Sequence, residues 1–133
     1  MTAVVTRQFK LGARSLKNLA GVHPDLQRVV HRAIQLTAID FGVIEGVRSL
    51  DKQKLYVSTG ASTTLNGRHL TGHAVDLGAY IGSELRWDWP LYRQLAEAMK
   101  KAAKELGIAI TWGGDWKRFP DGPHFELSWK VYP

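Results

Sequence analysis

The chain passes from a polar loop into a strand within residues 68–77, which read RHLTGHAVDL. Gly72 lies at the centre of this stretch and can adopt the left-handed backbone conformation that a tight turn requires. Residues 74–77 form a short apolar run that contains one carboxylate, a pattern typical of a strand. Because the chain reverses at Gly72, we expect His69 and Asp76 to face each other across a few ångströms.

Helices and further strands are predicted on both sides of this stretch. One long helix begins at Pro24 and another near Asp88, since apolar residues follow each at helical spacing. Ser49 is a suitable N-cap for a shorter helix over residues 50–58. Residues 41–47 are predicted to form a short strand, and alternating apolar residues predict two more strands, at residues 108–112 and 124–129. This order predicts one α+β domain spanning residues 1–133, with a mostly antiparallel sheet and helices packed on one side.

The composition limits the kinds of site that the chain can form. It has 133 residues, no cysteine and a formal net charge of +6. Without cysteine, disulfides and thiolate chemistry are excluded, and a metal would need His and carboxylate ligands. The positive charge favours acidic partners such as nucleic acid or anionic envelope polymers, although it can also serve solubility alone. The basic residues are scattered rather than gathered into a stripe, which does not favour nucleic acid.

The apolar segments are short. No apolar run approaches the roughly 20 residues that cross a bilayer. Residues 1–10 contain no apolar stretch like that of a secretory signal. We therefore expect neither stable membrane insertion nor a signal peptide.

Three separate segments carry side chains that can do chemistry. The first provides His69 and Asp76, the second provides Asp121 and His124, and the third provides Arg48 at the end of a predicted strand. Two imidazoles, one carboxylate ligand and a spare carboxylate are the components of a catalytic zinc site. His and Asp in a glycine-rich loop can equally form turns and caps. From the residues alone, both interpretations remain open.

Other catalytic patterns fit less well. His69 and His73 are four residues apart, as in a zinc-binding helix, but Gly72 lies between them and Leu70 replaces the expected Glu. We therefore predict that His73 contacts substrate or lies at the rim of the site. No serine lies in a Gly-x-Ser-x-Gly elbow, and the Gly113-Gly114 pair lacks the Lys of a phosphate-binding loop.

Taken together, the motifs resemble the D-alanyl-D-alanine carboxypeptidase and dipeptidase group of zinc peptidases. The likeness is greatest to its phage endolysin branch, the L-alanyl-D-glutamate endopeptidases. It extends from about residue 9 to residue 129. The matching residues are His69, Gly72, Ala74 and Asp76; Asp121, His124, Phe125 and Glu126; Glu45 to Ser49, Gln53, Leu55, Tyr56, Gly60 and Ser62; and Trp112 to Trp116.

The resemblance implies a role for each matching site residue. His69, Asp76 and His124 would bind one Zn²⁺ per chain, in a cleft. Asp121 would be the catalytic carboxylate, and Arg48 would bind substrate or stabilise the oxyanion. Asp115 also recurs in the family, and a hydrogen bond to a ligand is one hypothesis for it.

The resemblance also implies a substrate and a place of action. The substrate would be the peptidoglycan stem peptide, cut between L-Ala and D-Glu. The enzyme would be a monomer that waits in the host cytoplasm and reaches the cell wall after the membrane opens. Two alternatives remain: cleavage of the D-Ala-D-Ala bond, and a non-enzymatic zinc-stabilised module that binds nucleic acid or glycan.

Overall fold

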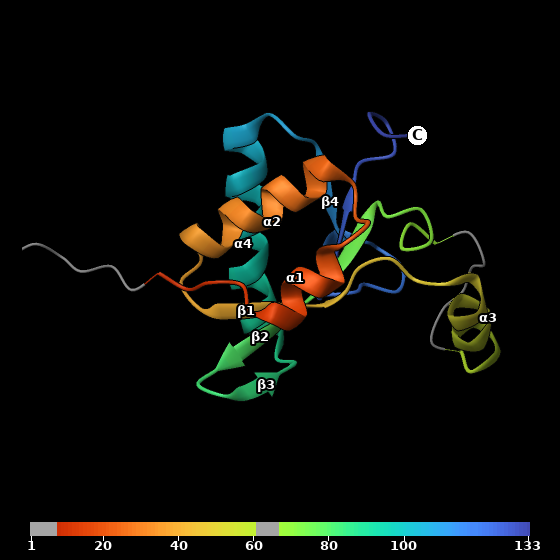
Figure 1. Cartoon of the computed structure of the whole chain (residues 1–133), viewed down its shortest axis with the longest axis horizontal. Coiled ribbons are helices and arrows are strands. Elements are labelled where there is room, and N and C mark those ends of the chain that lie inside the picture. The colour runs from red at the N-terminus through yellow and green to blue at the C-terminus, as the bar shows by residue number, and fades with distance from the viewer. Residues whose placement is uncertain (1–7, 61–66) are drawn as a thin grey trace, which may run out of the picture.

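The computed structural model describes residues 8–60 and 67–133 (Figure 1). The chain forms four α-helices, five strands and one short 3-10 helix within these residues. In chain order they are α1 (Ala13–Leu19), α2 (Pro24–Leu36), β1 (Asp40–Glu45), α3 (Leu50–Ser58), β2 (Ala74–Ile81), β3 (Glu84–Arg86), α4 (Trp89–Leu106), β4 (Ile110–Trp112), the 3-10 helix η1 (Gly113–Asp115) and β5 (His124–Leu127).

The strands form one sheet in which every pairing is antiparallel. The order is β1-β2-β5-β4, and β3 pairs with β2 outside this path. In the pairing of β2 with β5, Asp76 lies directly opposite His124. The predicted α+β class with an antiparallel sheet is confirmed, and the sheet brings together two segments that are 48 positions apart.

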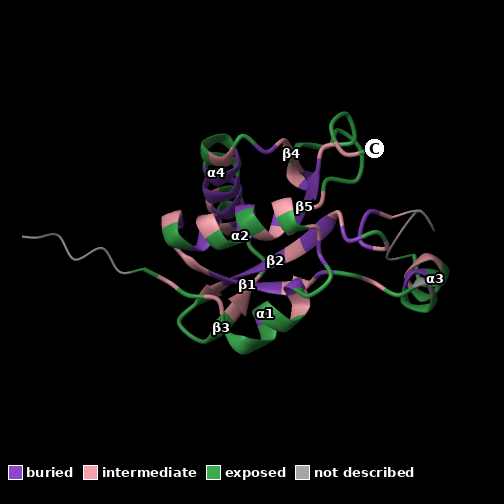
Figure 2. Ribbon diagram, turned by 45° about the horizontal axis from the view of Figure 1, so that its top comes forward, coloured by how far each residue is buried: buried purple, intermediate pink, exposed green. Residues whose placement is uncertain are grey.

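Alternation along the central strands gives the sheet two different faces. The face that we call the helix face carries apolar side chains that pack against α2 and α4; its members include Val75, Leu77, Phe125 and Leu127. The opposite face, which we call the polar face, carries Asp76, His124 and Glu126, since successive side chains in a strand point to opposite sides. All four residues of β5 are buried, so both faces are covered at this strand (Figure 2).

The two long helices begin and end as their sequences predict. Pro24 occupies the first turn of α2, and the His23 side chain caps that helix by accepting a hydrogen bond from the Asp25 backbone N–H. Helix α4 ends at Gly107, whose φ of 69° is the left-handed conformation of a C-cap glycine. Their apolar faces meet in the core with those of the sheet.

Some predicted bounds were wrong. The first strand ends at Glu45 and does not include Val47, and β4 begins at Ile110 instead of residue 108. The last strand ends at Leu127, so Trp129 lies in a turn and is 58% exposed. In these three strands backbone pairing covers fewer residues than the apolar pattern, whereas β2 extends to Ile81, beyond the predicted run at residues 74–77.

Helix α1 and the hairpin strand β3 were not predicted. Helix α1 lies along the edge strand β1, where Ser15 Oγ accepts a hydrogen bond from the Val43 N–H and Asn18 donates to the Val43 carbonyl. These bonds satisfy backbone groups that an edge strand otherwise leaves unpaired. The signal for α1 is two polar side chains and not an apolar stripe.

Helix α3 extends away from the rest of the fold in Figure 1. Ser49 caps it as predicted, since its side chain accepts a hydrogen bond from the Lys52 N–H.

The family match at Ser62 and the start of the chain, residues 1–7, lie outside the described residues. Over the ranges 8–60 and 67–133, no helix is both long and apolar enough to cross a membrane.

Candidate active site

The turn before β2 positions His69. Gly72 has a φ of +76°, and a Cβ on it would lie 2.7 Å from the Gly21 carbonyl oxygen, so a side chain there would be strained. The His69 carbonyl accepts a hydrogen bond from the Arg48 N–H at 3.0 Å. The ring is held as well, because His69 Nδ1 lies 2.9 Å from the Gly46 carbonyl oxygen. The loop is therefore fixed at both its backbone and its imidazole.

Asp76 lies between two imidazoles. Its Oδ1 is 3.2 Å from His69 Nε2 and 3.4 Å from His124 Nδ1. The two rings meet edge to face, with centroids 5.1 Å apart. One ligand atom from each of His69, Asp76 and His124 falls within 4.8 Å of the others. The structure thus brings together the three side chains that were predicted to bind a metal.

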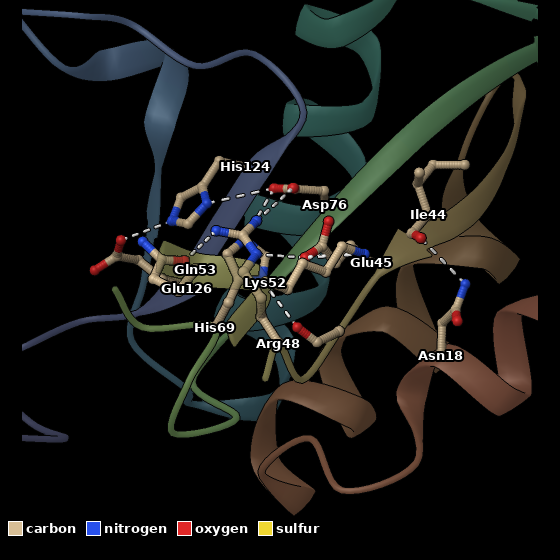
Figure 3. Close-up of polar contacts among 11 residues, drawn as sticks. Asn18, Ile44, Glu45, Arg48, Lys52, Gln53, His69, Asp76, His124 and Glu126 are labelled. Carbon is tan, nitrogen blue, oxygen red and sulfur yellow. Dashed lines mark hydrogen bonds and ion pairs between the residues drawn. The ribbon is translucent and has the colours of Figure 1, made fainter. Parts of the chain in front are cut away.

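Contacts on the far side of each ring determine which nitrogen faces Asp76. The Gly46 carbonyl can only accept, so His69 carries its proton on Nδ1 and turns Nε2 towards Asp76. His124 Nε2 lies 2.8 Å from Glu126 Oε1 (Figure 3). An ionised carboxylate can also only accept a hydrogen bond, so His124 carries a proton on Nε2. Its other ring nitrogen, Nδ1, faces Asp76. When both rings are neutral, two lone pairs therefore point at one carboxylate oxygen, an arrangement that needs a proton or a cation between them.

Two of the three distances between these donors fit a small tetrahedral cation, and all three donors lie within 4.8 Å of one another. Two donors that each lie about 2.1 Å from one ion at a tetrahedral angle are about 3.4 Å apart. The two distances to Asp76 Oδ1, 3.2 Å and 3.4 Å, match this value. The donor set of two imidazoles and one carboxylate is also one that zinc accepts. The residues therefore fit a mononuclear metal centre.

His69, Asp76 and His124 form what we call the cluster. Contacts within and beside it shift the pKa of Asp76 and the pKa of His124. Burial disfavours a charged Asp76, but hydrogen bonds with His124 and His69 outweigh it and hold the pKa of Asp76 well below its usual range. Burial also opposes a charge on His124, yet Asp76 and Glu126 raise its pKa to about 9. In the absence of a metal, the cluster thus retains a proton that a metal would displace.

Asp121 enters the site from the loop before β5. Its N–H donates to the Gly113 carbonyl at 2.9 Å, and its own carbonyl accepts from the His124 N–H at 3.3 Å. A Cβ on Gly113 would lie 2.5 Å from the Asp121 carbonyl oxygen, so glycine is needed for this close approach. Burial raises the pKa of Asp121, and the charge of Asp76 raises it further, although His124, His69 and Arg48 oppose the rise. The carboxyl group is therefore electrostatically part of the cluster.

Arg48 is held beside Asp76 by residues of β1 and α3 (Figure 3). Its Nη2 is 3.8 Å from Asp76 Oδ2, its Nε donates to Glu45, and its Nη1 donates to Gln53 Oε1 at 2.7 Å. The guanidinium also lies 4.6 Å from the centre of the Tyr56 ring. Only 10% of the Arg48 side chain is exposed. The sequence motifs contain Glu45 and Gln53 but indicate no role for them, and the structure shows that both residues orient Arg48.

His73 and Asp115 lie outside the cluster. His73 Nδ1 is 2.7 Å from Thr71 Oγ1, and its ring centre is 5.6 Å from that of His23. Asp115 forms an ion pair with Lys100 of α4 at 2.7 Å, and its side chain is 56% exposed. Its contacts are thus on the surface of α4, and the hypothesis that Asp115 bonds a ligand has no support in the structure.

Comparison with known proteins identifies the family. The sequence pattern of the phage L-alanyl-D-glutamate peptidases matches residues 7–128. An L-alanyl-D-glutamate peptidase of Escherichia phage T5 is 35% identical over 128 residues, which cover 93% of each chain. The chain belongs to this peptidase family. It is therefore an enzyme, and specifically a hydrolase.

A second relative differs in length. The L-alanyl-D-glutamate peptidase of Listeria phage A118 is 30% identical over 123 residues, which cover 90% of this chain. The chain spans only 43% of that relative's length. The family therefore includes longer proteins in which the matching region is one part.

Solved structures agree with this assignment. The fold matches that of the Serratia marcescens L-Ala D-Glu endopeptidase ChiX with a TM-score of 0.89 and 48% identity, covering 93% of this chain and 94% of the other. The vancomycin-resistance D,D-dipeptidase VanXYg matches with a TM-score of 0.55 and 19% identity, over 80% of this chain and 50% of that one. At that identity, the second match supports the fold alone.

Proposed function

We propose that this chain is a zinc-dependent endopeptidase that hydrolyses the L-Ala–D-Glu bond of the peptidoglycan stem peptide. His69, Asp76 and His124 would hold one Zn²⁺, and Asp121 would transfer protons. The observation that carries the proposal is the geometry around Asp76 Oδ1, where two imidazole nitrogens lie 3.2 and 3.4 Å away. The substrate is inferred from relatives whose names specify this bond.

The proposed reaction uses the groups around this centre. When bound at such a site, zinc polarises a carbonyl oxygen and makes water a nucleophile near neutral pH. A carboxylate oxygen of Asp121 would take a proton from the attacking water. The same oxygen would then return the proton to the leaving amine. Hydrogen bonds to Gly113 and His124 hold the Asp121 backbone in place for both steps.

Arg48 would act on the substrate side of the centre. Its Nε and Nη1 are engaged by Glu45 and Gln53, so the Nη2 group beside Asp76 is the part directed at the cluster. A fixed guanidinium can donate to a developing oxyanion without reorganisation during the reaction. We propose that Arg48 stabilises the oxyanion or binds the substrate carbonyl through Nη2.

The test is digestion of purified sacculi by the zinc-loaded chain, followed by mass analysis of the soluble products. Fragments with a new D-Glu amino terminus are expected, and a zinc chelator should abolish them. Restored zinc should restore release, which separates metal removal from damage to the protein. Products that lack a new D-Glu terminus would contradict the proposed bond, and release of free D-Ala would indicate the D-Ala-D-Ala bond instead.

The same assay addresses the non-enzymatic alternative. A module that only binds glycan or nucleic acid would release no stem-peptide fragments in the presence or absence of zinc.

We further propose that the whole chain, residues 1–133, is one peptidase domain that acts as a monomer. Its place of action would be the cell wall, reached from the host cytoplasm once the membrane has been opened.

A further inference from the structure

Glu126 lies on the polar face beside the proposed metal centre but faces away from the metal position. Its Oε1 is 2.8 Å from His124 Nε2, the ring nitrogen opposite the one that faces Asp76. Only 6% of its side chain is exposed. A buried carboxylate is costly unless it is paired and hydrogen-bonded. Its position therefore calls for an explanation beyond packing.

Arg68 supplies the opposite charge for Glu126. Its Nε lies 3.9 Å from Glu126 Oε2, and only 5% of the Arg68 side chain is exposed. Among the described residues, Arg68 Nε is a buried nitrogen that has no hydrogen-bond partner. Coulombic attraction at this distance is strong in a dry environment. Arg68 therefore compensates the charge of Glu126 and leaves the carboxylate oxygen Oε1 to His124.

The C-terminal turn holds Arg68 in this position. Arg68 Nη2 donates to the Leu127 carbonyl at 2.9 Å and to the Tyr132 carbonyl at 2.6 Å. The guanidinium carbon lies 4.0 Å from the centre of the Trp129 ring. Hydrogen bonds from Val131 and Tyr132 to the Ser128 carbonyl close this turn. Arg68 is therefore fixed by β5 and by the turn that follows it.

We infer that Glu126 is a positioning residue that holds His124 with Nδ1 towards the metal, and that Arg68 and Trp129 hold Glu126. This inference rests on the proposed function. A ligating imidazole is oriented by the partner of its other nitrogen, and a carboxylate in that role also raises the basicity of the ligand. The two imidazoles differ in this respect, because His69 is oriented by the neutral carbonyl of Gly46.

The first test needs no substitution. Imidazole nitrogen and proton resonances of the zinc-loaded wild-type chain show which nitrogen of each ring carries the proton. The expected result is a proton on Nε2 of His124 and a proton on Nδ1 of His69. A proton on Nδ1 of His124 would overturn the inference.

The second test measures zinc affinity by competition with a chromophoric chelator. Glu126→Gln keeps the size of the side chain, and its zinc dissociation constant should rise about 10- to 100-fold, as for other partners of metal-binding histidines. Glu97→Gln on the exposed surface of α4 is the matched control, because it removes the same charge away from the site. Its zinc affinity should equal that of the wild type. Equal affinity of Glu126→Gln and wild type would overturn the inference.

A third variant covers a failure of Glu126→Gln to fold. Trp129 is 58% exposed, so Trp129→Ala should fold while it loosens Arg68. A smaller rise of the zinc dissociation constant is expected, and an unchanged constant would count against the role of the C-terminal turn. All these readouts use the chain and zinc without peptidoglycan. If zinc-loaded wild type failed to cut sacculi, the proposed function would fail while the affinity comparison still decided the role of Glu126.

Discussion

The two faces of strands β2 and β5 serve different purposes although they share the same backbone. On the helix face, Val75 and Phe125 are fully buried among apolar side chains of α2 and α4. On the polar face, His124 is also buried and Asp76 is partly buried with 21% of its side chain exposed, and both contact charged or polar partners. Apolar burial on the helix face stabilises the fold. Burial of ionisable groups on the polar face costs folding free energy unless these groups are paired. Substitutions on the helix face should therefore lower the free energy of unfolding more than zinc binding, whereas substitutions on the polar face should lower zinc binding or turnover more than stability.

The largest effect is expected for His124→Ala on the polar face. It removes one of three proposed ligands, so the variant should lose stoichiometric zinc and measurable turnover. Elemental analysis of the purified protein and digestion of sacculi measure both. The variant should remain folded by circular dichroism, because the helix face is intact. A variant that retains one zinc per chain would refute the assignment of His124.

Asp121→Ala should separate turnover from metal binding. General acid–base catalysis contributes typically about 10²- to 10⁴-fold, so kcat should fall by that factor. Zinc content should remain that of the wild type, since Asp121 is not one of the three donors that converge. Steady-state kinetics on a soluble stem peptide measures the change. Near-normal kcat would remove Asp121 from the mechanism.

Phe125→Ala tests the helix face of the same strand. Truncation of a fully buried Phe typically costs about 3–5 kcal/mol of unfolding free energy. Chemical denaturation measures this loss, and Phe125→Leu serves as a milder variant if the alanine variant is largely unfolded. For the fraction that is folded, zinc affinity should stay close to that of the wild type. A large loss of affinity in a folded Phe125→Leu protein would show that the two faces are not independent.

Arg48→Lys should have a smaller effect on catalysis. Lysine keeps the charge but cannot bond Glu45 and Gln53 while it also directs a donor at Asp76. Loss of one oriented charge-assisted hydrogen bond, about 1.5 kcal/mol, corresponds to roughly a tenfold fall in kcat/KM. Zinc affinity should change little. An unchanged kcat/KM would exclude Arg48 from substrate or oxyanion binding.

The smallest effect is expected for Asp40→Asn at the start of β1. Burial raises the pKa of Asp40, although the Phe41 N–H opposes this rise, and its Oδ1 is buried without a hydrogen-bond partner among the described residues. Since the folded-state pKa is above the unfolded value, the protonated form favours folding, and this contribution is lost as pH rises through the folded pKa. At pH 7, Asp40→Asn should therefore be slightly more stable, by about 0.5 kcal/mol or less.

Thermal unfolding from pH 3 to pH 7 checks this prediction. The difference in Tm between variant and wild type should be largest at pH 7 and shrink towards pH 3, where Asp40 is protonated in both states. A difference that grew on acidification would contradict the sign.

The sequence by itself determined the elements whose signals are local. Pro24 and Gly107 mark helix ends because their backbone preferences act within one turn, and Gly72 marks the reversal before β2 for the same reason. The family motifs also named the three residues that the structure brings together. Helix α1 was missed because the hydrogen bonds that join Asn18 and Ser15 to Val43 of β1 connect residues 25 and 28 positions apart.

Only the tertiary structure decided how the named residues are oriented. Sheet register places Asp76 opposite His124, and register depends on the pairing of strands that are remote in sequence. The proton position on His69 depends on Gly46, and that on His124 depends on Glu126. Spacing in the chain does not reveal Gly46 as the partner of His69. Local chemistry therefore selects turns and helix ends, whereas the direction of the His69 lone pair depends on long-range packing.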